Sequence, residues 1–282
     1  MVGGADAARL GEALAGLPRM AVALSGGLDS RFLCHMALAS GCDVLALHAD
    51  GPHVPPAESE AARRWARERG LRLLTVTHDP LALPEVAANS RERCYACKCA
   101  LLAALRRTLD AAGEADRVLC DGGNADDLHA FRPGLRAVAE AGVRSPLALA
   151  GLGKDAIRAL ARATGLEHPD QAARPCLLTR LAYGMRPRAR LLARLARAEA
   201  ALAALDETDR DAHGPEGGFG EFRLRLTPEP LFQAMRLPAR LEGAVEELLA
   251  AQGFAPAVLR ATGTVSGFFD GAAAAPARNG RG

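Results

Sequence analysis

Three of the chain's seven cysteines lie within six positions, in the segment RERCYACKCALL at 91–102. Cys94 and Cys97 form a C-x-x-C pair, a spacing that brings two thiolates within reach of one metal site. Basic neighbours lower the pKa of a thiol. Arg91, Arg93 and Lys98 flank this cysteine pair, and Arg180 follows another cysteine, Cys176, far along the sequence. The segment therefore predicts thiolate chemistry, either metal binding or a reactive thiol, with ordinary packing as the alternative.

The other cysteines narrow this prediction. Cys34, Cys42 and Cys120 stand among apolar residues and are typical of buried thiols, and Cys99 is interpreted as a bystander. A zinc site usually has four protein ligands; no fourth Cys or His is obvious, although four histidines are available, His53, His78, His129 and His168. A redox C-x-x-C would open a helix after a strand, and that pattern is absent.

The segment VALSGGLDS at 22–30 predicts an anion-binding loop. Gly26 and Gly27 let the backbone turn closely around an anion, and the helix that follows adds its N-terminal partial charge. Hydroxyls of Ser25 and Ser30 supply further hydrogen bonds. Asp29 fits such a cradle if Mg²⁺ bridges its carboxylate to phosphate oxygens. The alternative is a capped strand-to-helix turn, but the ATPase pattern G-x-x-x-x-G-K-[ST] is absent.

A second polar segment, DGGNADD at 121–127, follows a strand-like run. Ligands bind beyond the carboxyl ends of strands in open parallel sheets. Asn124, Asp126 and Asp127 would offer an amide and two carboxylates to a metal or a ribose. The alternative interpretation is an Asx-rich turn that caps the next helix.

Alternating strand and helix patterns must position these residues. Strand–helix repetition with short links predicts an α/β fold, a doubly wound parallel sheet with helices on both faces. The expected strands are 19–25, 42–50, 71–79 and 116–123, and the expected helices include 30–41, 56–70, 98–113, 153–165 and 189–206.

Composition changes after residue 205. The Gly/Asp-rich stretch 206–220 predicts a linker or exposed loop, and a strand, helix and strand within 221–270 predict a smaller α+β C-terminal domain. The low-complexity tail 271–282 is expected to be mobile. The main domain would then be 1–205.

Bulk properties exclude some classes of protein. The formal net charge is +2, which gives no strong bias toward nucleic acid, and the arginines of 189–202 are interpreted as a solvated helix face. No apolar run reaches the roughly 18–20 residues of a membrane span, and the N-terminus lacks a secretory pattern. A cytoplasmic protein is therefore expected, and its oligomeric state, a homo-oligomer included, stays open.

The S-G-G-x-D-S motif on the first strand-to-helix turn resembles the PP-loop ATP pyrophosphatases. The resemblance implies a protein that binds ATP and Mg²⁺, splits ATP into AMP and pyrophosphate and adenylates a substrate. Several members of that superfamily place the adenine against the end of the second strand. By this resemblance Asp50, in LHAD at 47–50, would lie near the nucleoside.

Later blocks resemble the LarE-type sulfur transferases, which act in nickel-pincer nucleotide synthesis. They are RCYACK (93–98), DGGNADD (121–127), RPG (132–134), SPL (145–147), GLGKDAIRALA (151–161) and PCLLTRLAYG (175–184). Some LarE-type enzymes sacrifice one cysteine, and others hold a 4Fe–4S cluster on three. Cys94, Cys97 and Cys176 match the cluster type. The partners implied are a nucleotide-like carboxylate substrate and a sulfur donor, either sulfide or a persulfide carrier.

The same resemblance implies further site residues. Cys176, Asp29 and Arg180 are the expected catalytic residues, and Arg223 and Arg225 would contact a phosphate; alternatively, these last two face water from an edge strand. The family's GYR-x-GS-like segment is replaced by VLRATGTVSG at 258–267, with Arg260 where an acid is usual.

The predicted function is ATP-dependent adenylation of a pyridinium carboxylate mononucleotide or a similar carboxylate, followed by insertion of sulfur. One alternative is a tRNA-thiolating enzyme of the same fold, which would carry a basic surface for nucleic acid. Another is an ATP-dependent amide ligase with structural cysteines, and a third is a nucleotide-binding sensor that is not an enzyme.

Overall fold

The computed structural model describes residues 2–129, 133–214, 217–265 and 268–271. The described residues form two compact units. One lies within Met1–Ala87 and Arg91–Cys176, and the other within Ala88–Ser90 and Leu177–Gly282. Arg132 of the RPG block, the end of the VLRATGTVSG segment (266–267) and the tail expected to be mobile, from residue 272 onward, lie outside the described residues.

The first unit contains a four-stranded sheet in the order β3-β2-β1-β4. Its strands are β1 (Arg19–Ala23), β2 (Asp43–Asp50), β3 (Arg72–Thr77) and β4 (Val118–Cys120). All three pairings are parallel, and helices α2 (Leu28–Ala39), α3 (Pro56–Glu68) and α5 (Arg93–Ala111) connect successive strands. The prediction of an α/β protein with a parallel sheet is confirmed.

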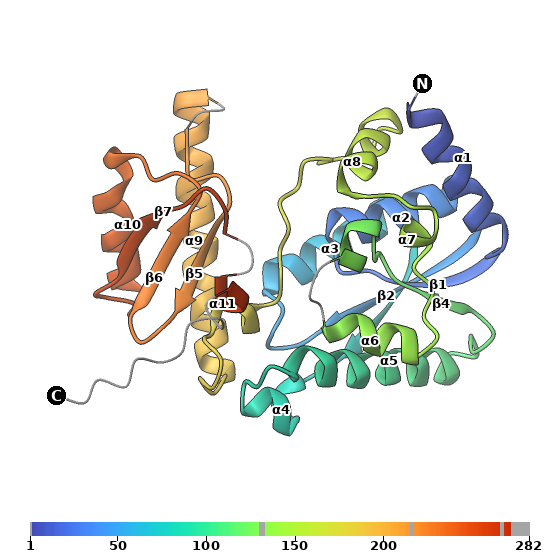
Figure 1. Ribbon diagram of the computed structural model, residues 1–282, viewed down its shortest axis with the longest axis horizontal. Coiled ribbons are helices and arrows are strands. Elements are labelled where there is room, and N and C mark those ends of the chain that lie inside the picture. The colour runs from blue at the N-terminus through green and yellow to red at the C-terminus, as the bar shows by residue number, and fades with distance from the viewer. Residues whose placement is uncertain (1, 130–132, 215–216, 266–267, 272–282) are drawn as a thin grey trace. The chain divides into compact units, whose positions relative to one another are not determined.

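Apolar residues on both sides of the sheet explain why helices cover its two faces. Successive side chains of a strand point to opposite faces. Met20 and Val22 pack with Phe32 of α2, whereas the intervening Ala21 packs with Leu105 of α5. Figure 1 shows α5 along one side of the sheet and α2 along the other.

The first unit begins with helix α1 (Val2–Ala15), which the sequence analysis did not anticipate. Six shorter or peripheral helical segments complete this unit. They are η1 (Pro80–Ala82), α4 (Pro84–Ala87), η2 (Ala125–His129), α6 (Pro133–Glu140), α7 (Pro146–Leu149) and α8 (Lys154–Ala163). The glycines of the N-terminal segment obscured α1, but Leu10 and Leu14, four residues apart, are fully buried in the core.

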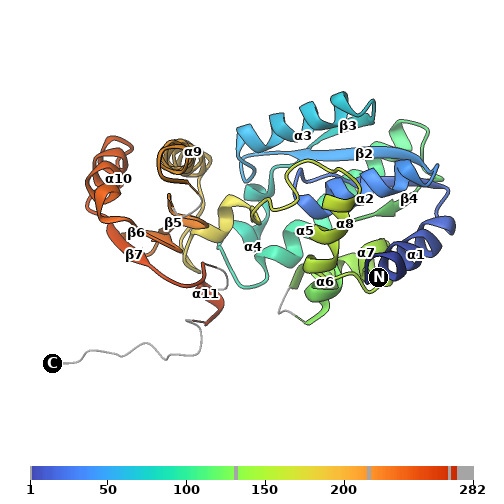
Figure 2. The same cartoon turned by 90° about the horizontal axis from the view of Figure 1, so that it is seen from above.

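The second unit contains a three-stranded sheet in the order β5-β6-β7. Strands β5 (Phe222–Leu226) and β6 (Pro230–Ala234) are antiparallel, and β7 (Val258–Ala261) runs parallel to β6. The helices are η3 (Leu177–Arg180), α9 (Ala189–His213), α10 (Ala239–Ala251) and α11 (Phe268–Gly271). Figure 2 shows α9 and α10 side by side against this sheet.

Helix α9 differs from the sequence expectation because it continues to His213, through the first part of the expected linker 206–220. Two buried carboxylates explain the extension. Asp206 pairs with Arg210 one turn later, and Asp209 pairs with Arg240 of α10. Within the described residues, no helix combines the length and the apolar character that crossing a bilayer requires.

Candidate functional site

The loop between β1 and α2, for which the sequence predicts an anion cradle, turns at Gly26. Gly26 has a φ of +82°, a conformation that glycine adopts without the steric cost other residues incur. The Ser30 hydroxyl lies 3.2 Å from the Ser25 amide nitrogen and donates to the Gly27 carbonyl at 3.1 Å. The two serine hydroxyls are 3.1 Å apart. Hydrogen bonds within the loop therefore hold its shape before any anion binds.

The loop after β4 packs directly against the start of α2. A Cβ added to Gly122 would lie 2.8 Å from the Ser30 amide nitrogen, so only glycine fits without displacement. This close approach lets the Asn124 amide donate to the Asp29 carboxylate at 2.9 Å. Asn124 is 1% exposed. The structure thus brings together Ser30, Asp29 and Asn124, which the sequence placed in two separate motifs.

Asn124 also organises the two acids that follow it. Its side-chain oxygen accepts from the backbone N–H groups of Asp126 and Asp127, at 3.0 and 3.3 Å. The Asp126 carboxylate accepts from the Lys154 amide at the start of α8, at 2.8 Å. The Asx turn considered in the sequence analysis is therefore present, and the same asparagine makes the contact with Asp29.

Asp50 lies at the carboxyl end of β2, in the same unit as the cradle. It pairs with Arg63 of α3 and lies 3.5 Å from the Ser59 hydroxyl. Behind it, the buried His48 connects the Ser59 hydroxyl, at 3.0 Å, to the Leu24 carbonyl, at 2.8 Å. A hydrogen-bonded chain thus runs from Asp50 to the residue that precedes the SGGLDS motif.

Helix α5 begins at Arg93, four residues earlier than Cys97, so all three clustered cysteines are helical. Cys94 and Cys97, three apart, share one face of a helix. Tyr95 occupies another face, where its hydroxyl donates to Glu140 of α6 at 2.6 Å. Glu140, and then Cys99, raise the pKa of Tyr95 to about 12. Cys99 therefore interacts with Tyr95, and its interpretation as a bystander stays a prediction.

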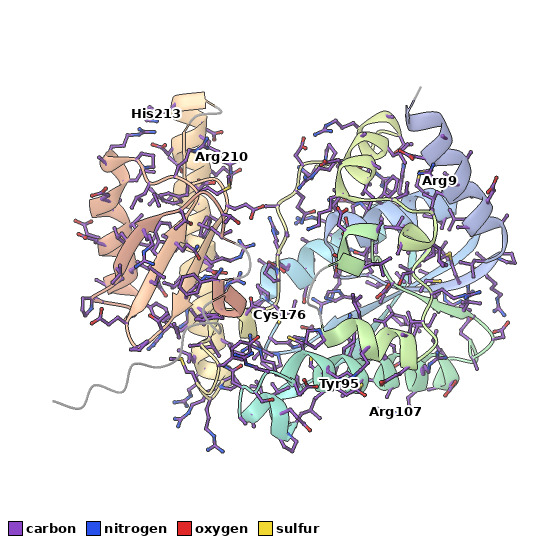
Figure 3. The ribbon with its side chains drawn as sticks, viewed as in Figure 1. Arg9, Tyr95, Arg107, Cys176, Arg210 and His213 are labelled. Atoms are coloured by element: carbon purple, nitrogen blue, oxygen red, sulfur yellow. The ribbon has the colours of Figure 1, made fainter. Side chains whose placement is uncertain are left out.

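The third cysteine, Cys176, approaches this helix from a distant part of the sequence. Burial, and then the nearby thiols of Cys176 and Cys94, raise the pKa of Cys97 to about 12. Figure 3 shows Cys176 at the end of the extended segment that follows α8. The thiols of Cys94 and Cys176 are thus both close enough to Cys97 to act on it electrostatically.

The direction of this pKa shift differs from the sequence expectation. Basic neighbours were expected to lower the thiol pKa values, and Lys98 does act on Cys97 in that direction. Burial has the larger effect because a thiolate away from water loses its solvation. Without a bound cation, Cys97 is consequently a neutral thiol at pH 7.

Two histidines adjoin the same thiol. The ligand atoms of His53, His78 and Cys97 all lie within 4.8 Å of one another, and the His78 Nε2 is 3.4 Å from the Cys97 sulfur. The sequence analysis named both histidines as available but did not connect either of them to the cysteines. The signal that could have found them is their position just beyond the ends of two adjacent strands.

The predicted arginines belong to the second unit and have protein partners there. Arg180 makes a bidentate pair with Glu199, at 2.7 and 2.9 Å. Arg225 donates to Gln233 at 2.6 Å and stacks over Phe268, with its guanidinium carbon 4.8 Å from the ring centre. Arg223 and Arg225 are 8% and 5% exposed. The interpretation in which both face water is therefore wrong, although β5 is an edge strand.

Comparisons with known proteins give relatives of two kinds. No model of a described protein family matches the chain. The uncharacterized protein slr1717 of Synechocystis is 36% identical over 218 residues, which are 77% of this chain and 80% of that protein. The uncharacterized protein MJ0830 of Methanocaldococcus jannaschii is 30% identical over 58% of this chain and 62% of its own length.

One relative has a named activity. The pyridinium-3,5-bisthiocarboxylic acid mononucleotide synthase of Lactiplantibacillus plantarum is 34% identical over 179 residues, 63% of this chain and 64% of that enzyme. The alignment thus spans slightly less than two thirds of the synthase. The chain belongs to the family of slr1717, and its similarity to the synthase supports a LarE-like sulfur transferase.

Proposed function

We propose that this protein is an ATP-dependent sulfur transferase that adenylates a carboxylate and then replaces the activated oxygen with sulfur. The substrate is a pyridinium carboxylate mononucleotide or a closely similar compound, as the name of the Lactiplantibacillus relative suggests. The observation that carries the proposal is that the thiols of Cys176 and Cys94 both act electrostatically on Cys97. These thiols belong to the same compact unit as the SGGLDS loop.

The residues of the loop fit ATP with Mg²⁺. The positive φ of Gly26 and the start of α2 favour a bound phosphate, while oxygen donors such as the carboxylates of Asp29 and Asp126 suit Mg²⁺. The Asn124 amide orients the Asp29 carboxylate. Asp127 and Asp50 complete the proposed nucleotide contacts.

In the first step, the substrate carboxylate oxygen attacks the α-phosphorus of ATP, and the bond to the β-phosphate breaks with release of pyrophosphate. The protein contributes by holding the phosphates in line and by stabilising their charge. Hydrogen bonds of the Ser30 hydroxyl keep the loop in its folded shape, and the start of α2 would add its partial positive charge next to the phosphates.

In the second step, sulfur attacks the carbonyl carbon of the adenylate, and AMP leaves. Cys94, Cys97 and Cys176 would hold a 4Fe–4S cluster, which supplies an iron without a protein ligand where sulfide can bind. The electrostatic effect of Cys94 and Cys176 on Cys97, and the free state of all three thiols, fit such a group. That Arg180 is catalytic and that Arg223 and Arg225 contact a phosphate stay predictions.

Cys176 offers a second source of sulfur. Its thiol could attack the adenylate to form a thioester as AMP leaves. Loss of the Cys176 α-proton and cleavage of its Cβ–Sγ bond would then give a thiocarboxylate and leave dehydroalanine in the chain. The same adjacency of thiols is compatible with this route, which consumes the enzyme after one transfer.

The decisive experiment starts with protein purified anaerobically and reconstituted with iron and sulfide. We expect the broad visible absorption of a 4Fe–4S cluster, pyrophosphate release that depends on the mononucleotide, and repeated sulfur transfer. Cys94→Ser and Cys176→Ser should lose the cluster and sulfur transfer but retain pyrophosphate release. Cys99→Ser, a change on the same helix, serves as the matched control and should behave as the unmodified protein.

Other results would redirect the proposal. Single-turnover transfer with loss of one H₂S from the peptide that contains Cys176 would indicate the sacrificial route. Full transfer by Cys176→Ser would contradict both routes. Pyrophosphate release that requires ammonia and no sulfur would instead indicate an amide ligase.

A further inference from the structure

The ends of two adjacent parallel strands bring His53 and His78 together. β2 ends at Asp50 and β3 at Thr77, and these two residues are register partners. The His78 amide then donates to the Asp50 carbonyl at 2.8 Å. A Cβ on Gly51 would lie 1.9 Å from the His78 carbonyl oxygen, so glycine is required where the two chain segments meet.

Helix α5 supplies the third member of the group. Its second turn carries Cys97, whose sulfur is 3.4 Å from the His78 Nε2. A tetrahedral zinc ion has Zn–S and Zn–N distances of about 2.3 and 2.0–2.1 Å, which separate S and N ligands by roughly 3.5 Å. The observed separation therefore equals one edge of a metal tetrahedron, as well as the length of a hydrogen bond to sulfur.

A hydrogen bond between His78 and Cys97 does not explain why His53 lies beside them. His53 is 6% exposed, and its Nδ1 is buried without a hydrogen-bond partner among the described residues. Buried polar atoms are almost always hydrogen-bonded or bound to an ion or water. The His53 and His78 rings meet edge to face, with centroids 5.5 Å apart, and both histidines have a ligand atom close to the same sulfur.

We propose that His53, His78 and Cys97 bind one divalent transition-metal ion of the zinc class, with the fourth position open. Two imidazoles and one thiolate are a donor set that Zn²⁺ and Co²⁺ accept, and three protein ligands with one open position are typical of reactive rather than structural zinc sites. A small soft ligand such as hydrosulfide would be a suitable exogenous ligand for the open position.

This inference goes beyond the proposed function and does not rest on it. The metal site uses both histidines and does not require Cys94 or Cys176, whereas the proposed cluster uses all three cysteines and neither histidine. Cys97 is common to the two, so one chain holds either the single ion or the cluster. Loading with one should therefore exclude the other.

The test uses the full chain, freed of metal by a chelator and titrated anaerobically with Co²⁺. We expect one ion per chain, the visible bands of tetrahedral Co²⁺ and a thiolate-to-cobalt charge-transfer band. X-ray absorption of the Zn²⁺ form should show one sulfur at about 2.3 Å and nitrogens at about 2.0–2.1 Å. Added sulfide should shift the charge-transfer band, and iron–sulfur reconstitution should release the cobalt.

Variants separate this site from the cluster. His53→Gln and His78→Gln should weaken Co²⁺ binding by more than the roughly 10- to 100-fold that loss of an outer-shell partner costs, yet still take up the cluster. Cys94→Ser and Cys176→Ser should do the reverse. His35→Gln and Cys99→Ser are the matched controls. Unchanged Co²⁺ affinity in both histidine variants would overturn the inference. So would X-ray absorption spectra of the Zn²⁺ form of the unmodified protein that show no sulfur ligand to the zinc. Either result would count whether or not the cluster forms.

Discussion

Asn124 is the residue on which the two sequence motifs depend. One side of its amide donates to Asp29, and the other accepts from the amides of Asp126 and Asp127. An alanine at this position would remove all three bonds from a site that is 1% exposed. Buried groups left without a partner cost about 1–3 kcal/mol each.

Asn124→Ala should therefore weaken ATP binding at least tenfold and lower the free energy of unfolding by about 1–3 kcal/mol. Calorimetric titration with ATP and Mg²⁺ and chemical denaturation measure the two effects. Asp121→Asn is the control on the same loop, because its remaining oxygen can still accept from Ser145 and Gly123. Equal ATP affinity in Asn124→Ala and the control would contradict the role given to Asn124.

Residue types and spacing predicted the cradle but not the histidine pair. Ser25, Gly26 and Asp29 are adjacent in sequence, so a local pattern contains their geometry. His53 and His78 are 25 positions apart and flank no motif. Their meeting depends on the register of β2 with β3 and on the close approach of Gly51 to the His78 carbonyl. A single sequence shows the glycine but neither the register nor the approach.

At the scale of elements, tertiary packing decides whether the alternating arginines of strand β5 face water or are buried. The alternating arginines suggested a water-facing edge, but Arg225 is covered by α11 and bonds to Gln233 of β6. The sequence analysis did not identify β6, whose five residues begin with proline. Because β6 was not predicted, the sequence offered no protein partner for the Arg225 guanidinium, which bonds to Gln233 of that strand.

The end of α9 gives a pH-dependent prediction. Arg240 and the Gly218 amide lower the pKa of Asp209 from 3.8 to about 2. The unfolded chain therefore takes up this proton at a higher pH than the folded chain. The stabilisation is fully present above about pH 4 and is lost as the pH falls toward 2.

Asp209→Asn should consequently lower the Tm by several degrees near neutral pH, and the difference from the unmodified protein should shrink as the pH falls from 3.8 to 2. Thermal denaturation followed by circular dichroism at a series of pH values measures this. Asp211→Asn changes an exposed carboxylate on the same helix and should leave the Tm nearly unchanged. A Tm difference that persists undiminished at pH 2 would show that the charge of Asp209 is not what stabilises the helix end.

At the scale of the whole molecule, the chain passes between its two compact units three times. Residues 88–90 belong with the C-terminal unit although their neighbours on both sides belong to the first. Asn89 is fully buried there and donates to the Ala182 carbonyl at 2.7 Å. Changes of composition along the sequence suggested a domain boundary at residue 205, and that division stays a prediction. Composition could not have shown that residues 88–90 belong to the C-terminal unit.

Each unit has its own fully buried phenylalanine, and this leads to a prediction about cooperativity. Phe32 belongs to the core of the first unit, and Phe232 of the second packs on Phe219, with ring centroids 5.1 Å apart. Replacing a buried phenylalanine with alanine costs about 3–5 kcal/mol. Because the cores are separate, calorimetry should resolve two transitions; Phe32→Ala should lower the Tm of one and Phe232→Ala that of the other. If both variants instead shifted one common transition to the same extent, the two units would be unfolding as one cooperative body, and the second unit would contribute to the stability of the SGGLDS loop.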